Sequence, residues 1–169
     1  YLIVCIVIYL LCASIFLPFT WDDAGIAFTY ARNLANGHGL VIYPGGERVE
    51  TYSDFLWVLI LALFTKIGLE TVFAAKLLGL FFGSASVSMV FFLGKKLFDT
   101  RVALLTAFLM AISQFLIRHA QWARSYSLQA LTAMLSLYFF IEFLNKKDWK
   151  SLGLYVLFTA SMLYTHYYL

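Results

Sequence analysis

Long apolar runs alternate with short polar breaks along the whole chain. The apolar runs cover residues 1–19, 71–93, 102–117, 125–143 and 152–169. Runs of roughly 17 to 25 residues have the length that an α-helix needs to cross about 30 Å of hydrocarbon while it satisfies its own backbone hydrogen bonds. The pattern therefore predicts an all-α fold, a polytopic transmembrane helical bundle with five spans.

The segment from Phe55 to Thr65 leaves two topologies open. Its apolar core of about 11 residues is shorter than a span and has the length of an interfacial or re-entrant helix. If it does not cross, the basic turns at 94–101 and 145–151 share one side, the cytoplasmic side, because short cytoplasmic loops are rich in Lys and Arg. If it does cross, both turns move outside. The charge pattern favours the first topology, with residues 20–70 and the loop at 118–124 outside.

The composition supports a membrane protein and argues against nucleic acid as a partner. Hydrophobic residues make up 63% of the 169 residues, charged residues 12%, and the mean hydropathy is +0.85. One soluble core of this size cannot bury so much apolar surface. The net charge of +3 is too small an excess to indicate nucleic acid binding. Cys5 and Cys12 share one face of the first run and are predicted to pack rather than to form a disulfide or metal site.

The first outer loop, residues 20–70, is predicted to contain interfacial helices. Thr20 can cap a helix that runs to about Asn36, with a left-handed stop at Gly37. Apolar and polar stripes on a 3.6-residue period, with Arg32 in the polar stripe, are typical of a helix that lies along a membrane surface.

Two adjacent carboxylates, Asp22 and Asp23, are the candidate catalytic residues. They belong to a group of six outer carboxylates among the nine of the chain: Asp22, Asp23, Glu47, Glu50, Asp54 and Glu70. Because the pair follows the first span directly, it is placed at the lipid headgroup level, where a general base could meet a lipid-linked phosphate and an acceptor hydroxyl. The alternative is a charged helix start, since carboxylates favour the positive end of a helix.

The second outer loop combines cations with aromatic residues. It contains Arg118, His119, Arg124 and Tyr126, and two arginines are more than the positive-inside pattern predicts on this side. These side chains could make charge-assisted hydrogen bonds to a phosphodiester at the membrane surface. Alternatively, they anchor the loop at the interface, where Arg snorkels and aromatic residues are common. His166, near the outer end of the last run, is a further candidate, and its alternative role is helix packing.

Several motifs occur in the same order as in GT-C glycosyltransferases. Trp21-Asp-Asp-Ala, Tyr30-Ala-Arg-Asn-Leu-Ala-Asn-Gly-His-Gly-Leu and Pro44-Gly-Gly-Glu-Arg-Val-Glu-Thr-Tyr-Ser-Asp-Phe-Leu-Trp resemble the first outer loop of these enzymes. Gln121-Trp-Ala-Arg-Ser-Tyr-Ser-Leu and Thr165-His-Tyr-Tyr are similar to their second outer loop and fifth span. The resemblance is nearest to the terminal arabinofuranosyltransferases and to the protein mannosyltransferase and lipid A aminoarabinose transferase group. It covers almost the whole chain, and because the chain lacks an initial Met and stops inside an apolar run, we expect an N-terminal part of a GT-C catalytic module.

The resemblance implies a hexosyl- or pentosyltransferase of the cell envelope. It would move a sugar, with inversion, from a polyprenyl-phosphate donor to a glycan, lipid or protein acceptor on the extracytoplasmic face of a prokaryotic plasma membrane. Asp22 matches the family's general base, Asp23 matches the adjacent acidic position, and Arg124 and Tyr126 match positions for donor-phosphate contact. Relatives often carry a carboxylate where this chain has Trp122, which puts a metal contribution from this loop in doubt. No cofactor is required by these motifs, and a divalent metal is an open alternative.

Two other functions stay open at this point. The chain could be a fragment of a transporter or flippase, or a non-catalytic lipid-binding membrane scaffold. A transporter would line a path near the bilayer midplane with charges and broken helices. Here the charges lie at the ends of the apolar runs, which favours the enzyme over the transporter.

Overall fold

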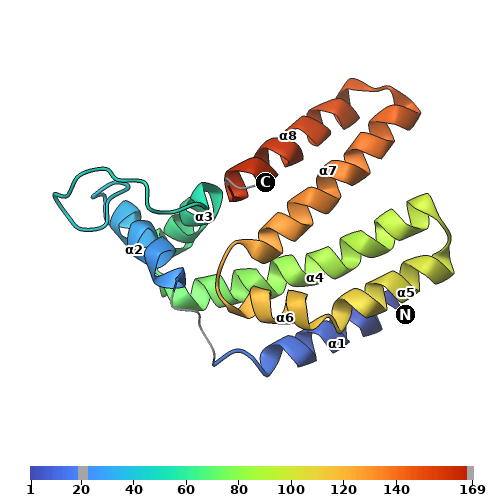
Figure 1. Cartoon of the computed structure of the whole chain (residues 1–169), viewed down its shortest axis with the longest axis horizontal. Coiled ribbons are helices and arrows are strands. Elements are labelled where there is room, and N and C mark those ends of the chain that lie inside the picture. The colour runs from blue at the N-terminus through green and yellow to red at the C-terminus, as the bar shows by residue number, and fades with distance from the viewer. Residues whose placement is uncertain (19–22, 167–169) are drawn as a thin grey trace.

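A computed structural model describes residues 1–18 and 23–166, and this part of the chain forms eight helices and no strand. The predicted all-α fold is therefore confirmed. The helices are α1 (Leu2–Ser14), α2 (Ala24–Ala35), α3 (Phe55–Lys66), α4 (Thr71–Leu97), α5 (Thr100–Ala111), α6 (Gln114–Gln121), α7 (Tyr126–Lys146) and α8 (Trp149–Thr165) (Figure 1).

Two helices, α4 with 27 residues and α7 with 21, are long and apolar enough to cross a membrane. A third candidate span is the pair α5 and α6, which is bent by 50°. α1 and α3 are apolar but shorter, with 13 and 12 residues. By length and composition, two or three of the five apolar runs thus qualify as spans within the described residues, as expected of an integral membrane helical bundle.

The apolar run at 102–117, predicted as one helix, is broken in the structure. α5 ends at Ala111, and the hydroxyl of Ser113 accepts a hydrogen bond from the backbone N–H of Leu116 to cap α6. A serine that offers this bond competes with continuation of the helix. The break turns α6 away from α5 and gives the residues around Arg118 a short helix of their own.

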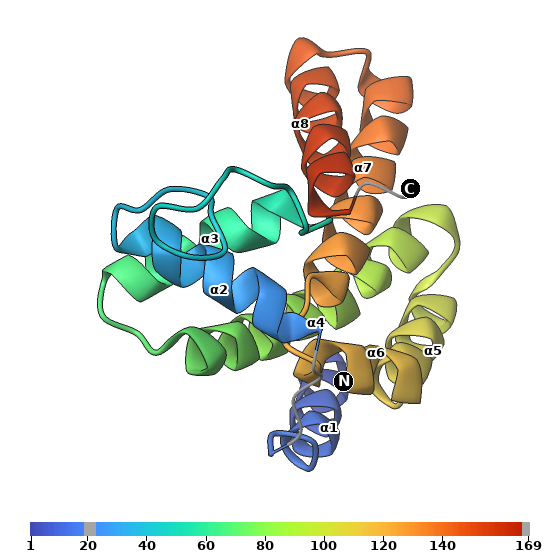
Figure 2. The same cartoon turned by 60° about the vertical axis from the view of Figure 1, so that its left-hand side comes forward.

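α4 is the central helix of the bundle. Figure 2 shows three groups of helices around it: α2 with α3, α7 with α8, and α1 with α5 and α6. Two glycines spaced four residues apart allow close packing, because a Cβ at Gly79 would overlap the carbonyl oxygen of Ala120, and one at Gly83 would overlap the hydroxyl of Tyr9. Small residues at this spacing are typical of helix contacts in membranes.

The two basic turns lie at the same end of the bundle. Lys96 of α4 and Lys146 of α7 both pair with Glu142, which joins the last turns of α4 and α7, and the α4–α5 and α7–α8 turns both lie on the right in Figure 1. The long loop with α2 and α3, the α6–α7 turn and the end of α8 lie towards the opposite end. There the ring of Tyr164 in α8 lies 6.1 Å from that of Phe55 in α3. The candidate residues of the two outer loops therefore share one end of the molecule.

Candidate functional site

The start of α2 brings the first outer loop to the second. α2 begins at Ala24 with Asp23 at its N-cap, later than the start after Thr20 that the sequence predicts. Asp23 makes no capping bond with its side chain, and its Oδ2 instead accepts a hydrogen bond from Nη1 of Arg124 at 3.2 Å, across 101 positions of sequence. Thr20 and the predicted base Asp22 lie outside the described residues. The predicted end of the helix is close to the observed one, because Gly37 adopts a φ of +83° just after α2.

Arg124 is held in the turn between α6 and α7. The preceding residue, Ala123, is fully buried and has a φ of +58°, a conformation that costs a residue with a side chain roughly 1–2 kcal/mol. Its carbonyl oxygen accepts a hydrogen bond from Nε1 of Trp57 at 3.2 Å, which ties the turn to α3. The side chain of Arg124 is 17% exposed and that of Asp23 63% exposed. The guanidinium therefore sits at the border of the packed interior, with one carboxylate on its open side.

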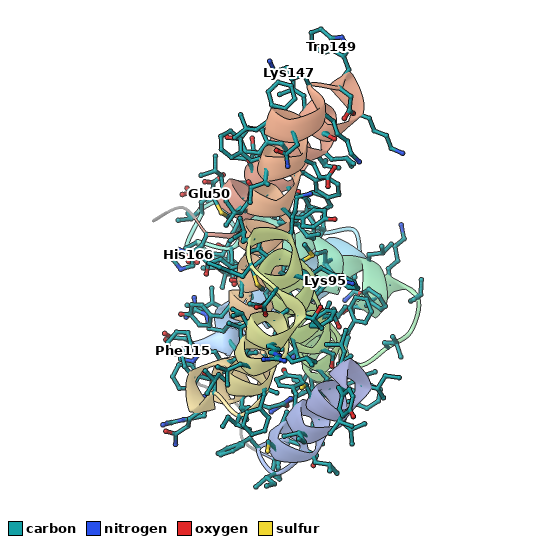
Figure 3. The ribbon with its side chains drawn as sticks, turned by 90° about the vertical axis from the view of Figure 1, so that its right-hand side faces the viewer. Glu50, Lys95, Phe115, Lys147, Trp149 and His166 are labelled. Atoms are coloured by element: carbon teal, nitrogen blue, oxygen red, sulfur yellow. The ribbon has the colours of Figure 1, made fainter. Side chains whose placement is uncertain are left out.

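Aromatic rings continue the site from Arg124. The guanidinium carbon lies 5.6 Å from the ring centre of Tyr126, and this ring lies 5.0 Å from that of His119 and 6.3 Å from that of His166. Nδ1 of His119 is 2.7 Å from the carbonyl oxygen of Phe115. A carbonyl can only accept, so Nδ1 carries the proton and Nε2 is the nitrogen that remains for other partners. Figure 3 shows Phe115 and His166 on the same side of the molecule.

Arg118 extends this surface along α6. Its guanidinium carbon lies 5.7 Å from the ring centre of Trp122, whose ring in turn lies 4.2 Å from that of His119. The structure thus brings together most of the residues that the sequence selects. We call them the Arg124 cluster: Asp23, Arg118, His119, Arg124, Tyr126 and His166.

Arg32 has other partners. Its Nη2 lies 3.0 Å from Oε1 of Glu70, and its Nε donates to the hydroxyl of Thr71 at 3.2 Å. Glu70 also caps α4 through the backbone N–H of Phe73 at 2.8 Å. Burial acts to raise the pKa of Glu70, but the backbone N–H groups of the first turn of α4 and the guanidinium of Arg32 lower it below its usual value. In these contacts Arg32 joins α2 to the start of α4, and it is not one of the side chains gathered around Arg124.

Asp54 lies in this region, but the sequence does not identify it as a catalytic or binding candidate. It is 2% exposed, and its Oδ2 has no hydrogen-bond partner among the described residues. Burial raises the pKa of Asp54, and the positive charges of Arg124 and His166 act against that rise. An Asp directly before an apolar helix is typical of an N-cap, so the sequence pattern gives no sign that this carboxylate is buried.

The cluster can accept a proton and bind an anion. It offers an exposed carboxylate, two guanidinium groups and two imidazole rings within one surface region. Within residues 1–18 and 23–166 there is no group of three or more His, Cys, Asp or Glu side chains placed to hold a metal ion. The residues of the cluster can supply a carboxylate base beside cationic side chains.

Comparison with known proteins finds one family. Residues 55–169 match the family described as dolichyl-phosphate-mannose-protein mannosyltransferase, and this match includes α3 through α8. No curated protein and no solved structure matches the chain significantly.

Proposed function

The chain belongs to the dolichyl-phosphate-mannose-protein mannosyltransferase family, and from this premise we propose that it transfers a sugar from a polyprenyl-phosphate donor to an acceptor on the outer face of the membrane. The donor carries its own leaving group, so the enzyme needs a base for the acceptor and cations for the departing phosphate. The acceptor is a hydroxyl group of a protein or glycan.

The observation that carries this proposal is the contact between Asp23 and Arg124. It joins the first outer loop, which supplies carboxylates, to the second, which supplies cations. In the reaction the acceptor oxygen attacks the anomeric carbon, and its proton passes to an aspartate. The bond from that carbon to the phosphate oxygen breaks with inversion, and polyprenyl phosphate leaves with the electron pair. An aspartate pair of which one member contacts a guanidinium suits this displacement.

Within the acidic pair we assign the base to Asp22. Asp22 matches the first-loop aspartate of the family motif, and Asp23 has Arg124 as a partner. The Oδ2 of Asp23 is already engaged by Nη1 of Arg124 at 3.2 Å. We therefore assign to Asp23 the role of holding Arg124, and to Arg124 and Tyr126, with Arg118, His119 and His166 around them, the contact with the donor phosphate.

The experiment compares Asp22→Asn with Asp23→Asn in the full-length protein reconstituted in liposomes. Sugar transfer is measured with polyprenyl-phosphate-linked mannose and, in parallel, with a polyprenyl-phosphate-linked pentose. Loss of a general base typically costs about 10² to 10⁴ in rate, so Asp22→Asn should fall by that factor and Asp23→Asn by less. Near-normal turnover of Asp22→Asn would remove it as the base, and loss in Asp23→Asn alone would transfer the role to its neighbour. Transfer from neither donor by the unmodified protein would contradict the proposed function.

A further inference from the structure

Two of the five carboxylates at helix starts in the described part of the chain make no capping bond, and they are the exposed Asp23, which pairs with Arg124, and the buried Asp54. Glu70, Asp99 and Asp148 each accept a hydrogen bond from a backbone N–H of the helix that they precede. Asp54 precedes α3 without such a bond, although it is almost fully buried. A buried carboxylate oxygen without a hydrogen-bond partner lowers the stability of the folded state. Its presence therefore points to a role other than stabilisation.

The surroundings of Asp54 come from three separate parts of the chain. Asp54 starts α3, Arg124 lies in the α6–α7 turn, and His166 follows the last residue of α8. The bond from Trp57 to the carbonyl oxygen of Ala123 holds α3 against that turn, one helical turn away from Asp54. Both Arg124 and His166 act electrostatically on the carboxyl group of Asp54. Two side chains of the Arg124 cluster therefore act on the same buried carboxyl group.

Arg124 consequently interacts with two carboxylates of different exposure. Exposed Asp23 accepts a hydrogen bond from Nη1, and the buried carboxyl group of Asp54 interacts electrostatically with the guanidinium. A guanidinium has five N–H donors, and the described bond to Asp23 uses one of them. Without the inner carboxylate, Arg124 would be free to close on Asp23 as a bidentate ion pair, the geometry that a phosphate must compete with.

We infer that Asp54 is a positioning residue for the donor phosphate: its buried charge holds Arg124 and His166 towards α3 and keeps guanidinium N–H groups open to the phosphate. This inference rests on the proposed function, because it takes the donor phosphate as the ligand of Arg124. It assigns Asp54 no contact with the sugar or the acceptor.

The test is a double-mutant cycle on the full-length protein, with polyprenyl phosphate without a sugar as the probe. Asp54→Asn keeps the shape of the side chain and removes its charge, and it should weaken binding of the probe about 10-fold. In an Arg124→Gln protein the same substitution should change binding by less than about two-fold, because its effect passes through Arg124. Glu47→Gln is the matched control, since it removes a carboxylate from an exposed position of the same loop and should leave binding unchanged.

A second measurement separates positioning from folding. Asp54→Asn removes a buried charge, so its thermal midpoint in detergent should equal or exceed that of the unmodified protein while binding falls. Equal weakening with and without Arg124, unchanged binding, or a joint fall of binding and thermal midpoint would each overturn the inference. If the unmodified protein binds the probe but transfers no sugar, the proposed function fails and the positioning role stands. If the unmodified protein does not bind the probe at all, both fail.

Discussion

At the scale of residues, position in the fold separates side chains that look equivalent in the sequence. Arg32 and Arg124 both lie beside an outer carboxylate, yet Arg32 pairs with Glu70 at 51% and 58% exposure, whereas Arg124 is 17% exposed beside Asp23. An exposed ion pair contributes little to stability because water and salt screen it. Arg124 is therefore the arginine whose charge has the stronger effect on a ligand.

Removal of Arg124 should weaken donor binding. A charge-assisted hydrogen bond to a phosphate contributes roughly 1.5 to 3 kcal/mol, so Arg124→Ala should reduce the affinity for polyprenyl phosphate about 10-fold or more. Arg32→Ala is the comparison, and it should leave affinity nearly unchanged. Lipid-phosphate binding can be measured by thermophoresis in detergent. An affinity of Arg124→Ala equal to that of the unmodified protein would return Arg124 to the role of an interfacial anchor.

The pH dependence of stability should report the burial of Asp54. Burial raises the pKa of Asp54 in the folded protein above 3.8, the ordinary value of an Asp side chain. The folded state then holds this proton more tightly than the unfolded state, so the free energy of unfolding falls as the pH rises from 3.8 through the folded pKa. Asp54→Asn should lack this fall when thermal midpoints are recorded between about pH 4 and about pH 7.

Asp148 provides a control of opposite sign for that experiment. The backbone N–H and the hydroxyl of Ser151 lower the pKa of Asp148, so its contribution to stability is present at neutral pH and is lost as the pH falls through its folded pKa. Asp148→Asn should therefore lose stability at neutral pH, where Asp54→Asn should not. The same sign of effect in both variants would contradict the assigned environment of Asp54.

The sequence predicts which kinds of side chain form this site, but not which of these side chains contact one another. Cations and carboxylates in two outer loops are visible as composition, and most of the selected residues come together around Arg124. The sequence cannot show that Asp23 binds Arg124 or that Asp54 is buried. The first contact joins the start of α2 to a turn 101 positions later, and the contact of α3 with the same turn joins residues 66 positions apart. Long-range packing decides these contacts, and a local pattern around Asp54 indicates only a helix start.

At the scale of elements, close contacts of α4 depend on glycine. Gly79→Ala would drive a Cβ into the backbone carbonyl of Ala120, which cannot move without shifting α6. We expect a loss of about 1–3 kcal/mol, measured as a lower thermal midpoint. Gly153 in α8 is the control, because nothing lies within 4 Å of a Cβ there. Gly153→Ala should be neutral or stabilising by up to about 1 kcal/mol, and equal losses in the two variants would contradict this packing.

Hydrophobic runs predict where helices occur but not where one helix becomes two. The run at 102–117 has the length of a span, and nothing in its hydropathy marks a break. The residue that marks the break is Ser113, which caps α6. On a hydropathy scale it counts only as one weakly polar position. Because α6 begins there, Arg118 and His119 lie on a helix that leaves the direction of α5 by 50°.

At the scale of the whole molecule, the length of α3 bears on which residues share a compartment. Its 12 residues reach about 18 Å, well short of the roughly 30 Å of the hydrocarbon core. α3 packs against α2, α4 and α8 at the end of the bundle that carries the Arg124 cluster, and α4 runs from there to the basic turns. We therefore keep the topology in which α3 does not cross and α4 makes a single crossing.

This topology predicts opposite labelling of two exposed positions, Glu50 and Lys95, which Figure 3 marks. In a cysteine-free background of the full-length protein, Glu50→Cys should react with an impermeant thiol reagent added outside intact cells. Lys95→Cys should react only after permeabilisation, because α4 separates the two positions and positively charged turns stay on the cytoplasmic side. If α3 crossed as well, two crossings would lie between the positions and both would label from the same side. That result would place the basic turns outside and remove the physical basis for an extracytoplasmic site.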